Sequence, residues 1–180
     1  MDLSETYVIS DDLELTEIRA SDRFSIIKHI NDEEISKNTL QIPFPYGEKD
    51  AEEFLNLCRE FEDKFEHVGQ FAIRYGGEMV GGIGFLYVYG ETSHIAEIGY
   101  WLGSELRGNG IATLSIRKII EIGFEVKGLL RIEANVFIDN YPSIKALERA
   151  GFEREGMRKA RFIKNDQLLD AYLYAVIKSV

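Results

Sequence analysis

The spacing of hydrophobic residues changes along the chain, and each change predicts a different element of secondary structure. Apolar and polar residues alternate over Leu13–Arg19, a pattern that is typical of a half-buried strand. Ser21 and Asp22 follow as candidate N-caps, because the apolar residues after them recur at helical spacing. A second amphipathic helix is predicted from about Lys49 to Lys64. We therefore expect the first third of the chain to form one strand and then helices.

The middle of the chain is rich in aromatic and β-branched residues at the spacing of strands. Three strands are predicted, over Gln70–Tyr75, Met79–Tyr89 and His94–Leu102. Gly76 and Gly77 form a short turn between the first two, and a longer turn covers Gly90–Ser93. Short turns between consecutive strands predict an antiparallel meander.

Helices and strands alternate in the last part of the chain. The predicted elements are a helix over about Gly110–Val126, a strand over Arg131–Phe137, a short helix near Asn140–Ala150, and closing strands over about Phe152–Ile163 and Leu168–Ile177. Strands that come first and then alternate with helices predict an α/β (α+β) fold around a sheet of mixed direction.

The composition is that of an ordinary globular protein. At 180 residues, we expect one domain over residues 1–180. The single cysteine, Cys58, excludes an intrachain disulfide, and Met1–Ser10 does not resemble a signal peptide, so a cytoplasmic location is expected. The apolar stretches are too short to cross a bilayer, which argues against a membrane partner. His29, His67 and His94 are scattered, and we expect no metal site.

The net charge of −10 is distributed unevenly along the chain. Residues 1–68 carry 18 acidic and 7 basic side chains, whereas residues 69–180 carry 13 acidic and 14 basic side chains. An acidic surface repels nucleic acid, so we expect no nucleic-acid partner. The acidic residues form either an ordinary solvated surface, or one that attracts a cationic substrate while the neutral part accepts an anionic cofactor.

The segment Trp101–Thr113 runs from a predicted strand through a glycine-containing loop into an amphipathic helix. Gly108 and Gly110 permit a positive φ and the close approach of a bulky group. The unpaired N–H groups at a helix start, together with the helix dipole, favour an anion such as a diphosphate. The alternative is a simple turn with a helix cap. The spacing fits neither the P-loop pattern nor the dinucleotide-binding glycine pattern.

Several motifs in this order resemble those of the GNAT superfamily of N-acetyltransferases. They are Arg107-Gly108-Asn109-Gly110-Ile111-Ala112, the preceding Glu97-Ile98-Gly99-Tyr100-Trp101-Leu102, and the downstream Asn140-Tyr141-Pro142-Ser143-Ile144 and Leu147-Glu148-Arg149-Ala150-Gly151-Phe152. The combination resembles the branch that holds the ribosomal-protein N-terminal acetyltransferases, and it extends over about residues 14–180. The resemblance implies a GNAT-like fold: a mixed, mostly antiparallel sheet of about seven strands with a central splay and flanking helices.

The same resemblance implies that acetyl-CoA is the cosubstrate and that a defined set of residues binds it. The strand residues Tyr100, Trp101 and Leu102 would bind the pantetheine arm through main-chain hydrogen bonds. The diphosphate would be held by the backbone amides of Arg107, Gly108, Asn109, Gly110, Ile111, Ala112 and Thr113. Asn140 matches a family asparagine that contacts the pantetheine arm, and it is equally a candidate helix N-cap.

The residues for proton transfer are less clear from the motifs. Leu147 occupies the position where many family members have a tyrosine that protonates the leaving thiolate. Ser143 matches a serine used in the ribosomal-protein branch, although it could be an ordinary first-turn helix residue, and Tyr141 is a weaker substitute. Glu97 lies among apolar strand residues that would raise its pKa, so it is either the general base or a structural ion-pair partner. Glu133 is a second choice whose strand pattern predicts an exposed position.

These observations predict an acetyl-CoA-dependent N-acetyltransferase that acts on a primary amine, for which a protein N-terminus is one candidate. The alternatives are acetylation of a small amine, such as a polyamine or an amino sugar, and a non-catalytic module that binds acetyl-CoA. The long closing strands and the aromatic residues also favour a homodimer.

Overall fold

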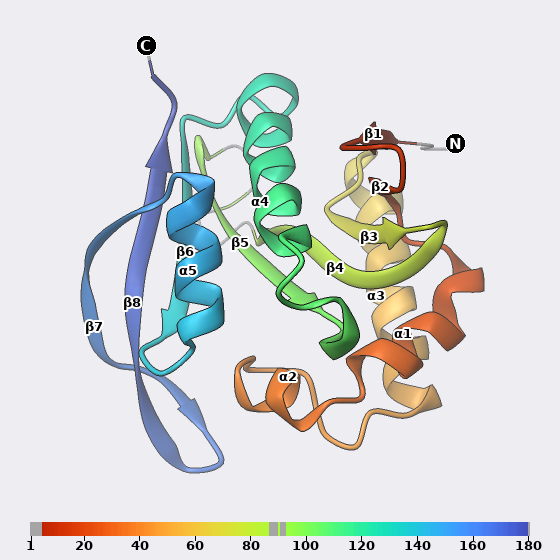
Figure 1. The fold of residues 1–180 in the computed structure, drawn as a ribbon, viewed down its shortest axis with the longest axis horizontal. Helices are drawn as coiled ribbons and strands as arrows, with labels where there is room; N and C mark the ends of the chain where they lie inside the picture. The colour runs from red at the N-terminus through yellow and green to blue at the C-terminus, as the bar shows by residue number, and fades with distance from the viewer. Residues whose placement is uncertain (1–4, 87–89, 91–92, 180) are drawn as a thin grey trace. The chain divides into compact units, whose positions relative to one another are not determined.

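The computed structural model describes residues 5–86, 90 and 93–179 (Figure 1). The helices are α1 (Arg23–Ile30), α2 (Glu33–Lys37), α3 (Glu48–Phe65), α4 (Ile111–Glu121) and α5 (Tyr141–Ala150). The strands are β1 (Thr6–Val8), β2 (Leu13–Glu17), β3 (Gln70–Tyr75), β4 (Glu78–Leu86), β5 (Ile95–Leu102), β6 (Arg131–Phe137), β7 (Glu153–Lys164) and β8 (Gln167–Ile177). Short 3-10 turns lie at Ala20–Asp22 and Ser104–Leu106, and a π-helical turn, Ile122–Val126, continues α4.

The predicted order of helices and strands is confirmed, with two additions. The three-residue strand β1 and the five-residue helix α2 were not predicted, because both are too short to produce a recognisable hydrophobic period. The last three residues of the predicted strand Met79–Tyr89 lie outside the described residues. So does the middle of the predicted turn Gly90–Ser93. The short turn before β4 has positive φ at both Gly76 and Gly77, as the sequence predicted.

The strands form a mixed, mostly antiparallel sheet, which confirms the predicted fold class. The strand order is β1-β2-β3-β4-β5-β6-β8-β7, so the sheet has eight strands and not about seven. β5 pairs with β6 in parallel over Ile95–Glu97 and Arg131–Glu133, and this pairing ends within both strands. Glu97 and Glu133 are therefore register partners at the last pair, which agrees with the predicted central splay.

The chain divides into two compact units, and neither unit is one continuous segment of the sequence. One unit comprises residues 1–84 and 100–111, and the other comprises residues 85–99 and 112–180. Because the division falls within β4 and β5, each unit contains part of these two strands. The single domain expected over residues 1–180 stays a prediction.

In the first unit, the helices before β3 share one apolar core with the sheet. Ile26, Ile30, Ala51 and Cys58 contribute from the helices, and Ala72, Met79 and Trp101 contribute from the strands; the cluster is completed by Ile18, Ile35 and Tyr46. Burial of this apolar surface is the main force that holds the helices on the sheet. In α3, Cys58 is buried whereas the neighbouring Leu57 is exposed.

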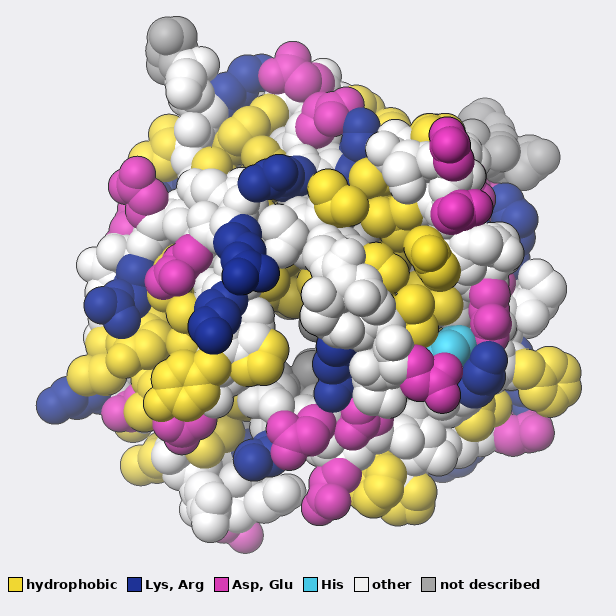
Figure 2. Space-filling view, viewed as in Figure 1, with side chains coloured by type: hydrophobic (Ala, Val, Ile, Leu, Met, Phe, Trp, Pro, Cys, Tyr) yellow, Lys and Arg dark blue, Asp and Glu magenta, His cyan; other side chains and the backbone are white. Residues whose placement is uncertain are grey.

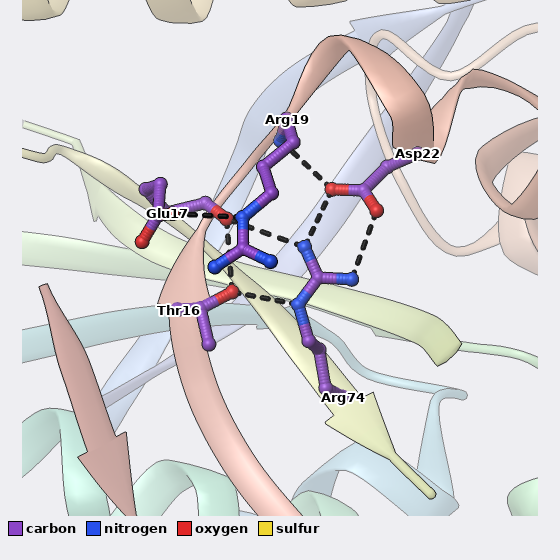
Figure 3. A network of polar contacts seen from close by, with 5 residues as sticks. All are labelled: Thr16, Glu17, Arg19, Asp22 and Arg74. Atoms are coloured by element: carbon purple, nitrogen blue, oxygen red, sulfur yellow. Dashed lines mark hydrogen bonds and ion pairs between the residues drawn. The ribbon is translucent and has the colours of Figure 1, made fainter. Parts of the chain in front are cut away.

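A buried ion pair joins the start of α1 to β3 (Figure 3). Both oxygens of Asp22 accept hydrogen bonds from the Arg74 guanidinium, at 2.8 and 2.7 Å, and Oδ2 also accepts the N–H of Arg19. The Arg74 Nε donates to the hydroxyl of Thr16 at 2.8 Å. Asp22 is the N-cap residue of α1, as predicted, but its side chain makes no cap hydrogen bond to that helix. Its carboxylate instead neutralises a buried arginine, which would be costly to leave unpaired.

In the second unit, the end of α4 and helix α5 pack against the sheet. A Cβ added at Gly123, just after α4, would lie 2.7 Å from Ile132 of β6, so the helix and the strand approach closely there. Figure 1 shows α5 in front of β6 and β8. The hydroxyl of Tyr174 in β8 donates to Glu148 of α5 at 2.9 Å. β7 and β1 are the two edge strands of the sheet. The predicted homodimer stays a prediction.

Charged side chains of both signs cover the surface. On the face drawn in Figure 2, acidic side chains lie among lysines and arginines and do not gather in one patch. Among the described residues, none of the helices is long and apolar enough to cross a membrane.

Candidate active site

The glycine-containing loop joins β5 to α4 and has the backbone geometry that the sequence predicted. Gly108 and Gly110 have φ values of +83° and +81°, a region that favours glycine. Both glycines are exposed, and a Cβ added to either would meet no protein atom within 4 Å. Ile111, the first residue of α4, is buried and anchors the helix start. The loop therefore presents a free backbone surface beside the amides of a helix N-terminus.

The strand that leads into this loop is held closely against β4. A Cβ added at Gly81 would lie 2.6 Å from the main-chain oxygen of Trp101, and one added at Gly82 would lie 2.7 Å from the indole nitrogen. The Trp101 side chain belongs to the core of the first unit, and Leu102 is also buried. Trp101 and Leu102 therefore have only their main-chain groups to offer a ligand, whereas Tyr100 is half-buried.

Arg107, the first residue of the loop motif, directs its guanidinium toward other parts of the protein. Its Nε donates to the carbonyl of Leu102 at 3.3 Å, and its Nη2 donates to Asp32 Oδ2 at 2.6 Å. Asp32 precedes α2 and is separated from Arg107 by 75 positions in the sequence. No pattern in the sequence predicted this pair.

Glu97 is half-buried in β5, and one neighbour holds its carboxylate. Its Oε2 accepts a hydrogen bond from Asn135 Nδ2 at 2.9 Å, and Asn135 Oδ1 accepts one from Arg158 at 3.3 Å. Burial raises the pKa of Glu97 above its usual value, the Asn135 hydrogen bond and the charge of Arg161 lower it, and the Glu133 charge raises it. The net shift is upward, as the sequence predicted.

Glu133 differs from its register partner, and its predicted exposure is wrong. Glu133 is only 6% exposed, and its neighbours Ile132 and Ala134 are also buried. Its Oε1 accepts from Arg131 Nε at 2.7 Å, and its Oε2 lies 3.9 Å from Arg158. Both carboxylate oxygens of Glu133 therefore lie beside arginines, and its use as the second-choice base stays a prediction.

The start of α5 carries the remaining predicted residues. Asn140 is the N-cap, and its Oδ1 accepts the backbone N–H of Ser143 at 3.3 Å, so the capping interpretation is confirmed. Ser143 is half-buried in the first turn, and Tyr141 is exposed. Leu147 is 1% exposed and lies in the core. Because its side chain is aliphatic, this position supplies no acid.

Sequence reasoning missed three polar residues: Asp32, Asn135 and Arg158. Asn135 occupies a strand position where only the register of β6 brings it to Glu97, and Arg158 reaches it from β7. In the part of the chain that the structure describes, no three His, Cys, Asp or Glu side chains come together as metal ligands would.

With this geometry established, comparison with known proteins identifies the family. The model of the acetyltransferase (GNAT) domain matches residues 12–153. The chain belongs to the GNAT acetyltransferase family. The L-amino acid N-acetyltransferase AaaT of Escherichia coli K12 is 30% identical over 146 residues, which cover 81% of this chain and 85% of AaaT. The N-acetyltransferase p20 of Bacillus licheniformis is 38% identical over 101 residues, and the match covers 56% of each protein.

Solved structures of GNAT proteins have the same fold. RimL, a ribosomal-protein alpha-N-acetyltransferase, in complex with coenzyme A aligns with a TM-score of 0.86 at 20% identity. The alignment covers 96% of this chain and 98% of RimL. The resemblance to the ribosomal-protein acetyltransferases that the motifs suggested is therefore confirmed at the level of the fold and family.

Proposed function

We propose that this GNAT protein transfers an acetyl group from acetyl-CoA to the nitrogen of a primary amine. The observation that carries the proposal is the loop of residues 107–113: two exposed glycines with positive φ lead into a helix N-terminus. Such a loop suits a bulky anion, because it offers backbone N–H donors without side chains in the way. The complex of RimL with coenzyme A supports the same ligand.

The described residues offer hydrogen-bond donors for two parts of acetyl-CoA. The amides of Arg107, Gly108, Asn109, Gly110, Ile111, Ala112 and Thr113 would hold the diphosphate, and the main chain of Tyr100, Trp101 and Leu102 would hold the pantetheine arm. The side-chain nitrogen of Asn140 is the group left for that arm, since its oxygen caps α5. When bound, acetyl-CoA supplies an activated acyl group on a thioester. The chain must orient that group and manage the protons.

Glu97 is the proposed general base. An amine attacks only as its neutral form, so a carboxylate must accept the ammonium proton directly or through a water molecule. Asn135 occupies one carboxylate oxygen of Glu97 and fixes its orientation. The raised pKa of Glu97, caused mainly by burial, makes it a better proton acceptor than an exposed glutamate.

Ser143 is the proposed acid that protonates the departing thiolate. It lies in the first turn of α5, where its backbone N–H is bound by Asn140 and its side chain is half-buried. The buried Leu147 cannot serve, and the exposed Tyr141 is the alternative donor. As the carbon–sulfur bond breaks, the Ser143 hydroxyl would pass a proton to the sulfur and regain one from solvent water.

An α-amine is the acceptor that this base suits best. The pKa of an α-amino group is about 8, whereas an alkylamine such as lysine is near 10.4, so an α-amine loses its proton far more easily to a carboxylate. RimL acts on a ribosomal protein and AaaT on L-amino acids, and both acceptors are α-amines. A protein N-terminus is the first candidate, a free amino acid the second, and a polyamine or amino sugar the third.

Release of free coenzyme A thiol tests all of these alternatives in one assay. The purified protein is incubated with acetyl-CoA and, separately, with a panel of N-terminal peptides, amino acids, polyamines and amino sugars. Thiol release with peptides or amino acids supports the proposed acceptor class, and release with polyamines or amino sugars alone contradicts it. Tight acetyl-CoA binding without release on any amine identifies a non-catalytic module.

A further inference from the structure

The loop of residues 107–113 is anchored just before Gly108 by contacts within the first unit. The N–H of Gly103 donates to the carbonyl of Val80 in β4 at 2.9 Å. The N–H of Arg107 donates to Ser104 at 3.2 Å, which closes the 3-10 turn Ser104–Leu106. Arg107 thus anchors the loop just before the open stretch Gly108–Gly110, and its side chain ends on Asp32.

Asp32 is itself held in place independently of the arginine. It is the N-cap of α2, and its Oδ1 accepts the N–H of Glu34 at 2.8 Å. Its backbone N–H donates to Ile30, and its carbonyl accepts from Ser36. One carboxylate oxygen therefore serves the helix, and the other, Oδ2, is presented to Arg107 at 2.6 Å.

A small polar hollow lies beside this ion pair. It has a volume of about 60 Å³ and is lined by Lys28, His29, Asn31, Asp32, Ser104 and Glu105. The start of α2 and the turn before the loop thus face each other across space that water can enter. The Asp32–Arg107 ion pair links the two segments. The charges of Asp32 and Arg107 cancel, so the arginine contributes little net charge to attract a diphosphate.

We propose that Asp32 is a positioning residue for acetyl-CoA binding, which it assists by holding Arg107 and, through it, the start of the Gly108–Gly110 loop. The inference rests on the proposed function of that loop. Asp32 acts through Arg107 and does not itself contact the cofactor. It keeps the loop amides in the geometry that receives the diphosphate, so that less loop entropy is lost when acetyl-CoA binds.

The test compares Asp32→Asn with Glu33→Gln by calorimetric titration of acetyl-CoA. Asparagine caps a helix as well as aspartate does, so Asp32→Asn retains α2 and removes only the charged partner of Arg107. Glu33→Gln removes an equal charge from the exposed neighbouring residue. We expect Asp32→Asn to weaken acetyl-CoA binding up to about fivefold, or about 1 kcal/mol, the upper range for a partly exposed ion pair. Glu33→Gln should leave the affinity unchanged.

Steady-state kinetics and a double variant separate positioning from a general structural effect. Asp32→Asn should raise KM for acetyl-CoA while kcat and the thermal midpoint stay near those of the wild type. In an Arg107→Gln background, Asp32→Asn should add no further loss. Equal affinities of the Asp32→Asn and Glu33→Gln proteins would overturn the inference, as would tighter binding by Asp32→Asn, which would make Arg107 a direct phosphate ligand. A wild type that does not bind acetyl-CoA would overturn the proposed function as well.

Discussion

The substitution Glu97→Gln separates a general base from a structural ion-pair partner, because the two roles predict opposite effects on stability. Glutamine has the same volume and still offers Asn135 an acceptor oxygen, so the contact at 2.9 Å is retained. Only the ability to take a proton and the negative charge are lost. A positioned general base contributes about 10²- to 10⁴-fold to the rate, so we expect kcat/KM to fall by that factor, or about 3–5 kcal/mol in the barrier.

The stability of the same variant should increase at neutral pH. The pKa of Glu97 is raised in the folded protein, chiefly by burial, so the folded state binds more protons than the unfolded state as pH rises from the usual carboxyl range. Stability that depends on Glu97 is therefore greatest at acid pH and is lost as pH rises through the folded pKa. Glutamine is neutral at every pH, so its advantage should be absent below about pH 4 and should grow toward pH 7.

Glu133→Gln is the matched control, because Glu133 is the register partner of Glu97 on the adjacent strand. The Glu133→Gln protein should lose about 1–3 kcal/mol of stability, because its hydrogen bond with Arg131 is no longer charged. It should keep the acidic limb of the pH profile of kcat/KM. The measurements are thiol release and thermal unfolding from pH 4 to pH 9. An active, destabilised Glu97→Gln protein would refute the assignment and leave Glu97 a structural residue.

The remaining predictions concern the loop, the acid and the acceptor. Gly110→Val should weaken acetyl-CoA binding in calorimetry by about 2 kcal/mol or more, whereas Gly128→Val, which strains a similar positive φ elsewhere, should affect only thermal stability. Ser143→Ala should lower kcat without changing acetyl-CoA affinity; an unchanged kcat would reassign the acid. KM for a cationic acceptor should rise with salt, and neutralising the exposed Glu52 and Glu60 should flatten that dependence in steady-state kinetics; a salt-independent KM would leave the acidic residues a solvated surface.

Much of the fold could be predicted because its elements are long enough to repeat a hydrophobic period. The bounds of β3 and β6 agree with the predicted strands, and α3 differs from its prediction by one residue at each end. β1 has three residues and α2 has five, so neither element completes two repeats of its own period. Asp22 illustrates a different limit, because local sequence favours a cap whereas its carboxylate binds Arg74, 52 positions away.

Residues of the candidate site could be predicted where they belong to one short segment of the sequence. The loop glycines and the cap Asn140 belong to local motifs, and backbone geometry bears out their conformations. Asn135 and Asp32 could not be found in this way, because each acts across a distance that only strand register or tertiary packing closes. A polar residue at a predicted strand position gives no sign of the side chain that it will meet.

Glu97 and Glu133 are register partners on the parallel strands β5 and β6, but the side chains that contact them differ in charge. Glu133 forms an ion pair with Arg131 at 2.7 Å. Glu97 meets the neutral amide of Asn135, whose orientation is set by Arg158, since a guanidinium can only donate and therefore selects the amide oxygen. The amide nitrogen is then left to face Glu97, which is held firmly without a direct ion pair. Glu133 is thus held in an ion pair, whereas Glu97 is held by a neutral amide and has a pKa that burial raises.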